Sequence, residues 1–176
     1  SIKKFVQISS SEVYGSAKYT PIDENHPLQP QSPYSATKIG ADALCNSFFY
    51  SFGIPVVIAR PFNTFGPRQS LRAVIPTIIN QVLKKRKKIK LGIVSTKRDF
   101  VYIDDTCFGI YKLMLSSKKT NGNTFNISSS KSYSIKEIFY KIKKVCKSNC
   151  SLTIDNKRIR PKNSEVVELL GSSKKI

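Results

Sequence analysis

The chain has 176 residues, of which 40% are hydrophobic and 10% aromatic, a composition typical of a globular domain with a buried core. Its formal net charge is +19, but the basic residues are spread along the whole sequence, which argues against a dedicated nucleic-acid surface. No apolar run approaches the roughly 20 residues that span a bilayer, and no signal peptide opens the sequence, so we expect no membrane partner and a cytoplasmic location.

The first predicted element is a buried strand, Phe5–Ile8, which is followed by a cluster of serines. Because the chain begins at Ser1 and enters this strand almost at once, we expect it to be a fragment of a longer protein. Residues Thr20–Ser32 are rich in Pro, Asn, Gln and Asp, which predicts an exposed loop with His26 at the surface.

A helix with clear ends comes next. Ser32 is a suitable N-cap, Pro33 fits the first turn, and Gly53 can end the helix. The β-branched run Pro55–Ala59 then predicts a parallel strand that leads into the loop Arg60–Arg68. Loops at the carboxyl ends of strands are where open α/β sheets bind ligands, so this loop is a candidate site.

The rest of the sequence continues to alternate helices and strands. We expect a helix over Ala73–Lys84, strands at Ile89–Leu91 and Phe100–Ile103, a helix after Asp104, a strand at Thr124–Ile127, a helix through Val145 opened by the capping box Ser134–Glu137, and a strand at Leu152–Ile154. This order predicts an α/β fold with smaller mixed elements toward the carboxyl end. No phosphate-binding GxGxxG loop occurs in the sequence.

Neither the cysteines nor the densest basic run predicts a site. Only Cys146 and Cys150 are close in sequence, and no second ligand pair completes a metal centre, so we expect no metal and small packing residues. The run Lys84–Lys88 follows a predicted helix, where cations complement the helix dipole, so we interpret it as a solvated helix end.

The strongest chemical pattern places a phenol and an ammonium group on one helical face, because Tyr34 and Lys38 are four residues apart. A nearby cation favours the phenolate, which can take a proton from a substrate hydroxyl. The segment Ser9–Gly15, at the end of the first strand, adds hydroxyls and the Glu12 carboxylate. Together these segments predict an active site.

Four motifs, in this order, carry a resemblance to a known family. They are Ser-Ser-Glu-Val-Tyr-Gly at 10–15, Ser-Pro-Tyr-Ser-Ala-Thr-Lys at 32–38, Arg-Pro-Phe-Asn-Thr-Phe-Gly-Pro-Arg at 60–68 and Arg-Asp-Phe-Val-Tyr-Ile-Asp-Asp at 98–105. The chain resembles the NAD-dependent nucleotide-sugar epimerases and dehydratases of the extended short-chain dehydrogenase/reductase family. The resemblance implies NAD as cofactor, a nucleotide-diphosphate sugar as substrate, a homodimer, and a missing dinucleotide-binding amino half.

The resemblance also implies a division of the chain and a role for each motif. Residues 1–68 would form the carboxyl-side part of the Rossmann domain, and 69–176 a mainly substrate-binding lobe interleaved with the last sheet elements. Tyr34 would be the catalytic base, and Lys38 would lower its pKa and hold the nicotinamide ribose. The implied catalytic set is Ser10, Ser11, Glu12, Tyr34 and Lys38; the cofactor side adds Ser9, Pro61 and Phe62; the substrate side has Asn63, Arg72, Ala73, Val74, Arg98 and Arg160.

Glu12 favours one reaction within the family. A 4-keto group acidifies the C5 proton, and a carboxylate must remove that proton as water leaves C6, so Glu12 indicates a nucleotide-sugar 4,6-dehydratase. The stretches around Arg60–Ile79 and Arg160–Glu165 most resemble dehydratases of UDP- or GDP-N-acetylglucosamine. A UDP-sugar 4-epimerase and a UDP-glucuronate decarboxylase remain alternatives, because Glu12 does not separate them completely.

A non-enzymatic alternative also stays open: the chain could be an inactive or split-gene module that needs a separate NAD-binding half. In the resemblance, the helix that bears Tyr34 and Lys38 takes part in dimerisation. Phe48, Phe49 and Phe52 on that helix fit either a dimer surface or core packing.

Overall fold

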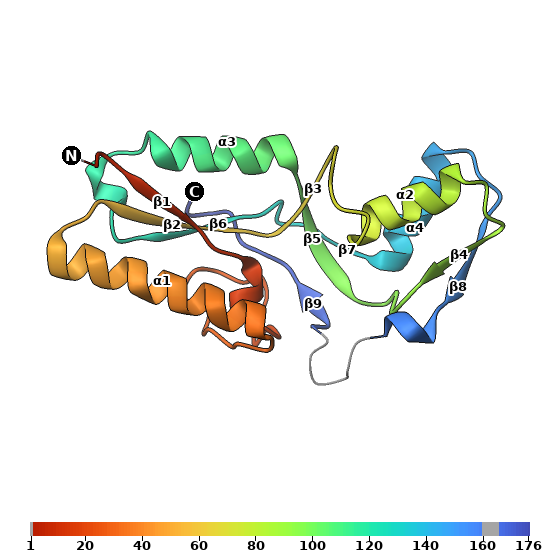
Figure 1. Cartoon of the computed structure of the whole chain (residues 1–176), viewed down its shortest axis with the longest axis horizontal. Coiled ribbons are helices and arrows are strands. Elements are labelled where there is room, and N and C mark those ends of the chain that lie inside the picture. Colours follow the sequence, from red (N-terminus) through yellow and green to blue (C-terminus); the bar gives the residue numbers. More distant parts are fainter. Residues whose placement is uncertain (1, 160–165) are drawn as a thin grey trace.

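The structure, a computed structural model, describes residues 2–159 and 166–176. Its first sheet contains three parallel strands in the order β1 (Phe5–Ile8), β2 (Val56–Pro61) and β6 (Thr124–Ile127). Helix α1 (Pro33–Phe52) covers one face of this sheet and α3 (Ile103–Met114) covers the other, as Figure 1 shows. A parallel sheet with helices on both faces confirms the predicted α/β fold.

The predicted burial of β1 is wrong, although its bounds are as expected. Phe5 is 43% exposed and Ile8 is 47% exposed. Strand β1 pairs with β2 alone among the described strands and so lies at the edge of the sheet. The neighbouring β2 lies between two strands, and its residues Val56–Arg60 are all buried.

Local sequence signals fix the ends of α1 as predicted. The Ser32 hydroxyl accepts a hydrogen bond from the Ser35 amide, and the Ser35 hydroxyl accepts one from the Ser32 amide. Pro33 occupies the first turn, where a missing N–H costs nothing. Gly53 ends the helix with φ of 66°, a left-handed conformation that favours glycine. The helix therefore begins and ends where its own sequence dictates.

The second part of the molecule contains smaller, mixed sheets. Strand β5 (Lys97–Tyr102) pairs in parallel with β3 (Asn63–Phe65) and β9 (Glu168–Leu169) and antiparallel with β7 (Ser132–Ser134). Strands β4 (Lys88–Leu91) and β8 (Ser151–Ile154) form a parallel pair. Strands β3, β7 and β9 were not predicted, because each has only two or three residues and carries no periodic signal.

Helices α2 (Val74–Leu83) and α4 (Ile135–Val145) lie side by side near the β4–β8 pair (Figure 1). The predicted capping box at the start of α4 is confirmed, since the Ser134 hydroxyl accepts from the Glu137 amide and Glu137 accepts from the Ser134 amide. Short 3-10 turns complete the fold at η1 (Ser11–Tyr14), η2 (Lys118–Thr120) and η3 (Asn156–Arg158).

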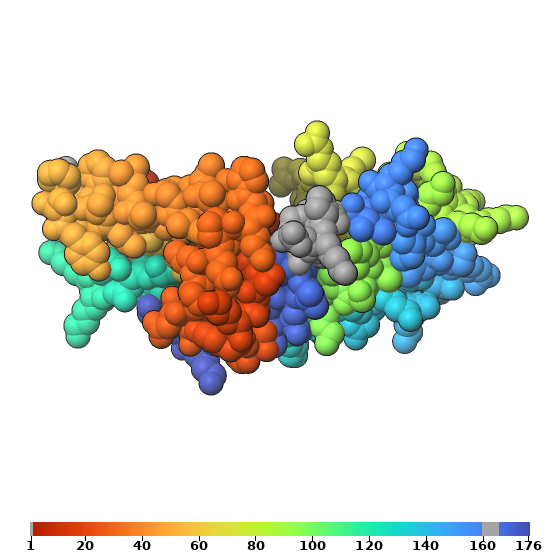
Figure 2. Space-filling model, turned by 90° about the horizontal axis from the view of Figure 1, so that it is seen from below, coloured from red at the N-terminus to blue at the C-terminus, as the bar shows by residue number. Residues whose placement is uncertain are grey.

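Each of the two parts has its own hydrophobic cluster. The first lies around the β1–β2–β6 sheet and contains Val13, Tyr14, Ile22, Val57, Ala59, Phe62, Val101, Leu113, Phe125, Ile127 and Leu169. The second lies between α2, α4 and the β4–β8 pair and contains Ile78, Val82, Ile89, Leu91, Ile135, Ile138, Phe139 and Cys150. Figure 2 shows the corresponding elongated surface, with the end of α1 near one end and the lysine-rich segment after α2 at the other.

The loop between η1 and α1 is more buried than its composition predicts. His26 is 2% exposed rather than at the surface, because its ring packs against Tyr14 and Tyr19. Its Nε2 accepts a hydrogen bond from the Lys18 amide at 2.9 Å. Ile22 is fully buried as well, so this loop forms part of the first cluster.

The basic run and the cysteines lie as follows. Lys84–Lys88 are exposed after the end of α2, as expected for a solvated helix end. All four cysteines are free thiols, and Cys107 is exposed whereas Cys150 is buried. Within residues 2–159 and 166–176, no helix has the length and apolarity needed to cross a bilayer.

Candidate active site

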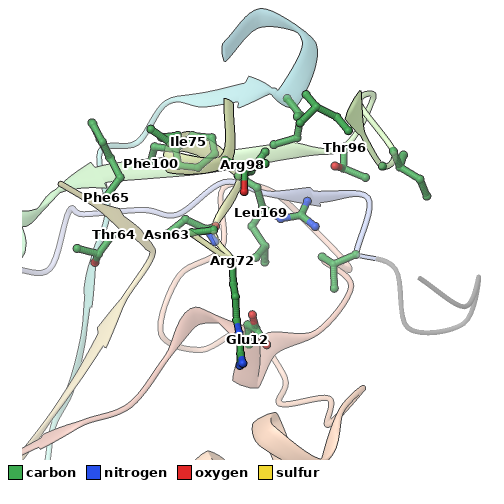
Figure 3. A pocket seen from close by; sticks show the side chains of 18 of the residues that line it. Glu12, Asn63, Thr64, Phe65, Arg72, Ile75, Thr96, Arg98, Phe100 and Leu169 are labelled. Atoms are coloured by element: carbon green, nitrogen blue, oxygen red, sulfur yellow. The ribbon is translucent and has the colours of Figure 1, made fainter. Parts of the chain in front are cut away.

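A cavity of about 360 Å³ lies between the two parts of the molecule. Figure 3 shows its walls, which come from η1, the loop before α2, β3 and β5. Among the described lining residues, Glu12 is the acid, and Arg72, Arg98 and Arg158 are the cations. The cavity therefore carries a net positive charge that suits a polyanionic ligand such as a diphosphate.

Glu12 reaches the cavity from η1, the turn that follows β1. The Ser10 hydroxyl caps this turn by accepting from the Glu12 amide at 3.1 Å. Gly15 ends the turn with φ of 61°, and a Cβ at this position would lie 2.6 Å from the Gln29 carbonyl oxygen. Only glycine fits there, and the tight turn keeps Ser10 and Glu12 at the carboxyl end of β1.

Tyr34 and Lys38 lie beside each other on the first turns of α1. Lys38 Nζ is 5.9 Å from the centre of the Tyr34 ring and donates a hydrogen bond to the Ile8 carbonyl at 3.0 Å. The Tyr34 side chain is 50% exposed. Neither residue lines the cavity, but Ser32 and Ser35, from the same turn of the helix, do. The phenol is thus exposed at the start of α1, close in sequence to two residues that line the cavity.

The predicted substrate-side residues are brought together in the cavity. Asn63, Arg72, Ala73, Val74 and Arg98 all line it, although they come from three separate elements. The Oδ1 atom of Asn63 is buried and has no hydrogen-bond partner within the described part of the chain. In Figure 3 the Arg72 side chain extends toward Glu12. Arg160 lies outside the described residues.

Several predicted residues lie behind the cavity rather than in it. Ser9 and Ser11 are buried, and the Ser9 hydroxyl donates to Asp42 at 2.8 Å. Phe62 belongs to the first hydrophobic cluster, and its amide donates to the Ile127 carbonyl. The Phe62 side chain is therefore not available to a ligand, whereas Pro61, at the end of β2, is half-buried.

A buried polar network behind the site was not predicted from the sequence. Asp42 and Arg60 form an ion pair at 3.0 Å, and Arg60 also donates to the Tyr14 hydroxyl at 3.1 Å. The sequence does contain a signal for it. Asp42 continues the four-residue spacing of Tyr34 and Lys38, and Arg60 is a charge that directly follows an apolar strand. A cavity cation, Arg158, was also missed, although it lies two residues before Arg160, which the resemblance had placed on the substrate side.

Another buried carboxylate, Asp99 on β5, joins the two parts of the molecule. Its Oδ1 accepts from the amide and hydroxyl of Ser129, and its Oδ2 accepts from the Gly171 amide. Burial raises the pKa of Asp99 above its usual value, and these hydrogen bonds offset part of that effect. Asp99 ties β5 to two loops and does not line the cavity.

Comparison with known proteins bears out the resemblance read from the motifs. The chain is 30% identical over 187 aligned residues to the mouse dTDP-D-glucose 4,6-dehydratase, in an alignment that covers 99% of this chain and 52% of that protein. It is 36% identical over 137 residues to the dTDP-D-glucose 4,6-dehydratase of Dictyostelium discoideum, covering 72% of this chain and 31% of that one. The chain thus spans about half of the length of such relatives, or less.

Solved structures show the same fold. A UDP-N-acetylglucosamine 4-epimerase from Methanobrevibacter ruminantium, in complex with UDP-N-acetylmuramic acid, superposes with a TM-score of 0.90 at 30% identity, over 99% of this chain and 55% of that chain. A UDP-glucuronic acid 4-epimerase from Bacillus cereus, in complex with UDP-glucuronic acid and NAD, gives a TM-score of 0.90 at 29% identity, over 99% of this chain and 54% of that chain. The family model described as GDP-mannose 4,6 dehydratase matches residues 1–176. Motifs, fold and family model agree, and the chain belongs to this family of nucleotide-sugar dehydratases and epimerases.

Proposed function

We propose that this chain supplies the catalytic residues and the sugar-nucleotide pocket of an NAD-dependent nucleotide-sugar 4,6-dehydratase. The observation that carries the proposal is the position of Glu12. It is the acid among the described lining residues of the cavity, and it lies on the same turn as Ser10. A 4-epimerase needs no second base, whereas a dehydratase does.

The first step in this proposal is oxidation at C4 of the sugar. Tyr34 removes the proton of the C4 hydroxyl, and the Lys38 ammonium lies 5.9 Å from the centre of the Tyr34 ring. Ser10 would donate or accept a hydrogen bond at the same hydroxyl. NAD, when bound, would supply the hydride acceptor for this oxidation and the hydride donor for the later reduction.

The chain offers a suitable place for the nicotinamide end of that cofactor. Tyr34, which is exposed, and Lys38, which is half-buried, lie next to the carboxyl end of β1, where open α/β sheets bind dinucleotides. Ser9 and the backbone of Pro61 and Phe62 belong to the same sheet edge. The sequence has no GxGxxG loop, the motif with which many Rossmann domains bind the pyrophosphate of a dinucleotide.

The second step is the loss of water. The C4 ketone acidifies the C5 proton, so the Glu12 carboxylate removes that proton, the C5–C6 double bond forms, and the C6 hydroxyl leaves as water. The hydride then returns to C6 and a proton to C5, which leaves a 4-keto-6-deoxy sugar. With Ser11 buried and Glu12 in the cavity, Glu12 would serve as base and then as acid to the leaving hydroxyl.

The arginines of the cavity account for the nucleotide part of the substrate. Arg98 on β5 and Arg72 before α2 can bind the diphosphate through planar guanidinium groups. Ala73 and Val74, at the start of α2, supply backbone and apolar surface beside them. Asn63 has an unpartnered buried oxygen that can accept a hydrogen bond from the sugar.

The relatives support the reaction class but differ in sugar. The two dehydratases named above act on dTDP-glucose by name, whereas the two solved structures named above are UDP-sugar epimerases. We propose a nucleotide-activated N-acetylglucosamine as substrate, with dTDP-glucose as the competing one. The proposal includes a cytoplasmic location and the division into a Rossmann part at 1–68 and a substrate lobe at 69–176.

A homodimer through α1 belongs to the same proposal. Leu44, Phe48, Tyr50 and Phe52 are exposed along this helix, and the Phe48 and Phe52 rings lie 5.4 Å apart at the surface. Phe49 instead is half-buried and packs against Gly122, where a Cβ would lie 2.3 Å from its ring. Of the three phenylalanines, Phe48 and Phe52 are therefore exposed, whereas packing within the chain accounts for Phe49.

The test is product analysis with the protein and NAD. UDP-N-acetylglucosamine, GDP-N-acetylglucosamine and dTDP-glucose are each incubated, and the product mass and the absorbance of the 4-keto sugar in base are recorded. We expect the loss of one water, which Glu12→Gln abolishes while hydride exchange at C4 is retained. Asp105→Asn, an exposed carboxylate on α3, serves as the matched control and should leave the rate unchanged.

Other outcomes would change the assignment. An unchanged mass with inversion at C4 would make the protein an epimerase and leave Glu12 without a role. Release of carbon dioxide from UDP-glucuronate would indicate a decarboxylase. Turnover only after a separate NAD-binding polypeptide is added would support the split-module alternative.

A further inference from the structure

A buried carboxylate on α1, Asp42, lies behind the candidate active site and outside the lining of the cavity. Its Oδ2 accepts three hydrogen bonds: one from Ser9 Oγ at 2.8 Å, one from Arg60 Nε at 3.1 Å and one from Arg60 Nη2 at 3.0 Å. Asp42 is 2% exposed and Arg60 is 5% exposed. A single oxygen atom thus connects α1 to the ends of both β1 and β2.

The same guanidinium group reaches the far end of the η1 turn. Arg60 Nη1 donates to the Tyr14 hydroxyl, and the guanidinium carbon lies 5.0 Å from the centre of the Tyr14 ring. The Tyr14 hydroxyl in turn donates to Asn126 Oδ1 at 2.7 Å. Burial raises the pKa of Tyr14, so its hydroxyl keeps the proton that it donates.

These contacts bracket the segment that carries the proposed chemistry. Ser9 comes directly before Ser10, and Tyr14 comes two residues after Glu12. Both ends of the segment are therefore bound to the Asp42–Arg60 pair, one through Asp42 and the other through Arg60.

The other catalytic pair is fixed to the same ion pair through the helix. Asp42 is two helical turns beyond Tyr34 and one turn beyond Lys38 on the same face of α1. The Lys38 ammonium adds a hydrogen bond to the Ile8 carbonyl, one residue before Ser9. The spacing between the Tyr34 side and the Glu12 side of the site is thus set by contacts that touch neither ligand nor cavity.

Stability alone is a weak reason for such an arrangement. Removing two charges from water costs several kcal/mol per ion, and an apolar pair of equal volume often stabilises a protein at least as well. A buried ion pair with directional hydrogen bonds does something that an apolar pair cannot, because it accepts only one relative placement of the elements that it joins.

We propose that Asp42 and Arg60, with Tyr14, are positioning residues that hold the Ser10–Glu12 turn in register with Tyr34 and Lys38. The kinetic consequence rests on the proposed function, but the restraint that these three residues place on the Ser10–Glu12 turn can be measured without turnover. Catalytic groups must be placed within a fraction of an ångström, and an error of about 1 Å can cost about 100-fold in rate.

The first test is Tyr14→Phe, which keeps the buried ring and removes only the hydroxyl. We expect kcat for C4 oxidation to fall about 10- to 100-fold, with an unchanged KM and unchanged affinity for a nucleoside diphosphate, because the cavity lining is intact. Tyr19→Phe is the matched control, since it removes a hydroxyl bond of 2.8 Å to Asp23 outside the network. A kcat within about twofold of the Tyr19→Phe value would overturn the proposal.

The second test uses amide hydrogen exchange and needs no substrate. Tyr14→Phe and Asp42→Asn should each speed exchange of the amides in residues 10–15 at least about tenfold, while the amides of α4 stay protected. Unchanged exchange in residues 10–15, in a variant that remains folded, would overturn the proposal. If the wild-type protein turned over no nucleotide sugar, the proposed function would fail. This exchange measurement would still decide whether Asp42, Arg60 and Tyr14 restrain the Ser10–Glu12 turn.

Discussion

The two hydrophobic clusters of this molecule differ in the kinds of side-chain interaction that stabilise them. The cluster around β1, β2 and β6 encloses the charged and hydrogen-bonded groups of Asp42, Arg60, Tyr14 and Asn126. The cluster between α2, α4 and the β4–β8 pair consists of aliphatic and aromatic side chains and the Cys150 thiol, and the polar side chains buried beside it on α2, Thr77 and Gln81, are uncharged. The first arrangement fixes directions, and the second mainly excludes water.

The difference matches what each part is proposed to do. Proton transfer between Tyr34, Glu12 and a sugar tolerates little displacement, and so the catalytic part is built from directional contacts. A nucleotide held between Arg72 and Arg98 tolerates more, because charges act over longer distances. Perturbations of the two parts should therefore be distinguishable, one by its effect on rate and the other by its effect on stability.

The largest effect is expected at the catalytic part. Tyr34→Phe removes the proposed base while the exposed ring stays, so kcat should fall about 10²- to 10⁴-fold with little change in thermal stability. Tyr50→Phe, on the same helix and 78% exposed, should leave both quantities unchanged. Steady-state kinetics and thermal unfolding test this pair, and a Tyr34→Phe protein with near wild-type kcat would remove Tyr34 from the mechanism.

A mutation in the apolar part should give the opposite result. Phe139 is 1% exposed in the α2–α4 cluster, and Phe139→Ala should lower the free energy of unfolding by about 3 to 5 kcal/mol. The rate per folded molecule should change little, because Phe139 does not line the cavity. Denaturant unfolding measures the first quantity, with the exposed Val145→Ala on the same helix as control. A large loss of kcat in molecules shown to be folded would contradict the separation of the two parts.

The smallest expected effect lies at the start of α4. Ser134→Ala removes the N-cap bond and should cost about 1 kcal/mol at neutral pH. The hydrogen bond from the Ser134 side chain is the main cause that lowers the pKa of Glu137 below its usual 4.5. A carboxyl group whose pKa is lowered on folding stabilises the fold when the pH is above its usual pKa. This contribution is lost as the pH falls through the lowered pKa.

The pH dependence sharpens that prediction. The difference in unfolding free energy between wild type and Ser134→Ala should be largest at neutral pH and should narrow in acid, where Glu137 is protonated. Urea unfolding at the two pH values measures it. A difference that is independent of pH would mean that the bond from Ser134 to Glu137 contributes nothing to the cap.

Most helices and strands were predictable because their signals are local. The Ser32 cap and Gly53 define α1, and the Ser134–Glu137 capping box defines the start of α4. The bounds of β1 and β6 agree with their apolar runs. Tyr34, Lys38 and Glu12 could be named as candidates, because the residue types and their spacing are readable along the chain.

The contacts between distant segments could not be predicted in this way. Tyr14 and Asn126 are 112 residues apart in the sequence, and no local pattern reports their hydrogen bond. His26 has a polar surrounding sequence, and only the packing of Tyr14 and Tyr19 against its ring buries it.

The sequence by itself determined the helices and the longer strands of this protein, the family to which it belongs and the chemical types at its candidate site. Only the tertiary structure decided that β1 is an exposed edge strand and that β3 pairs with β5. It also decided that the Asp42–Arg60 pair contacts both segments that bear the proposed catalytic groups, the η1 turn and α1. The physical reason is that caps and periodicity act within a few residues, whereas strand order and buried ion pairs depend on which distant segments meet when the chain folds.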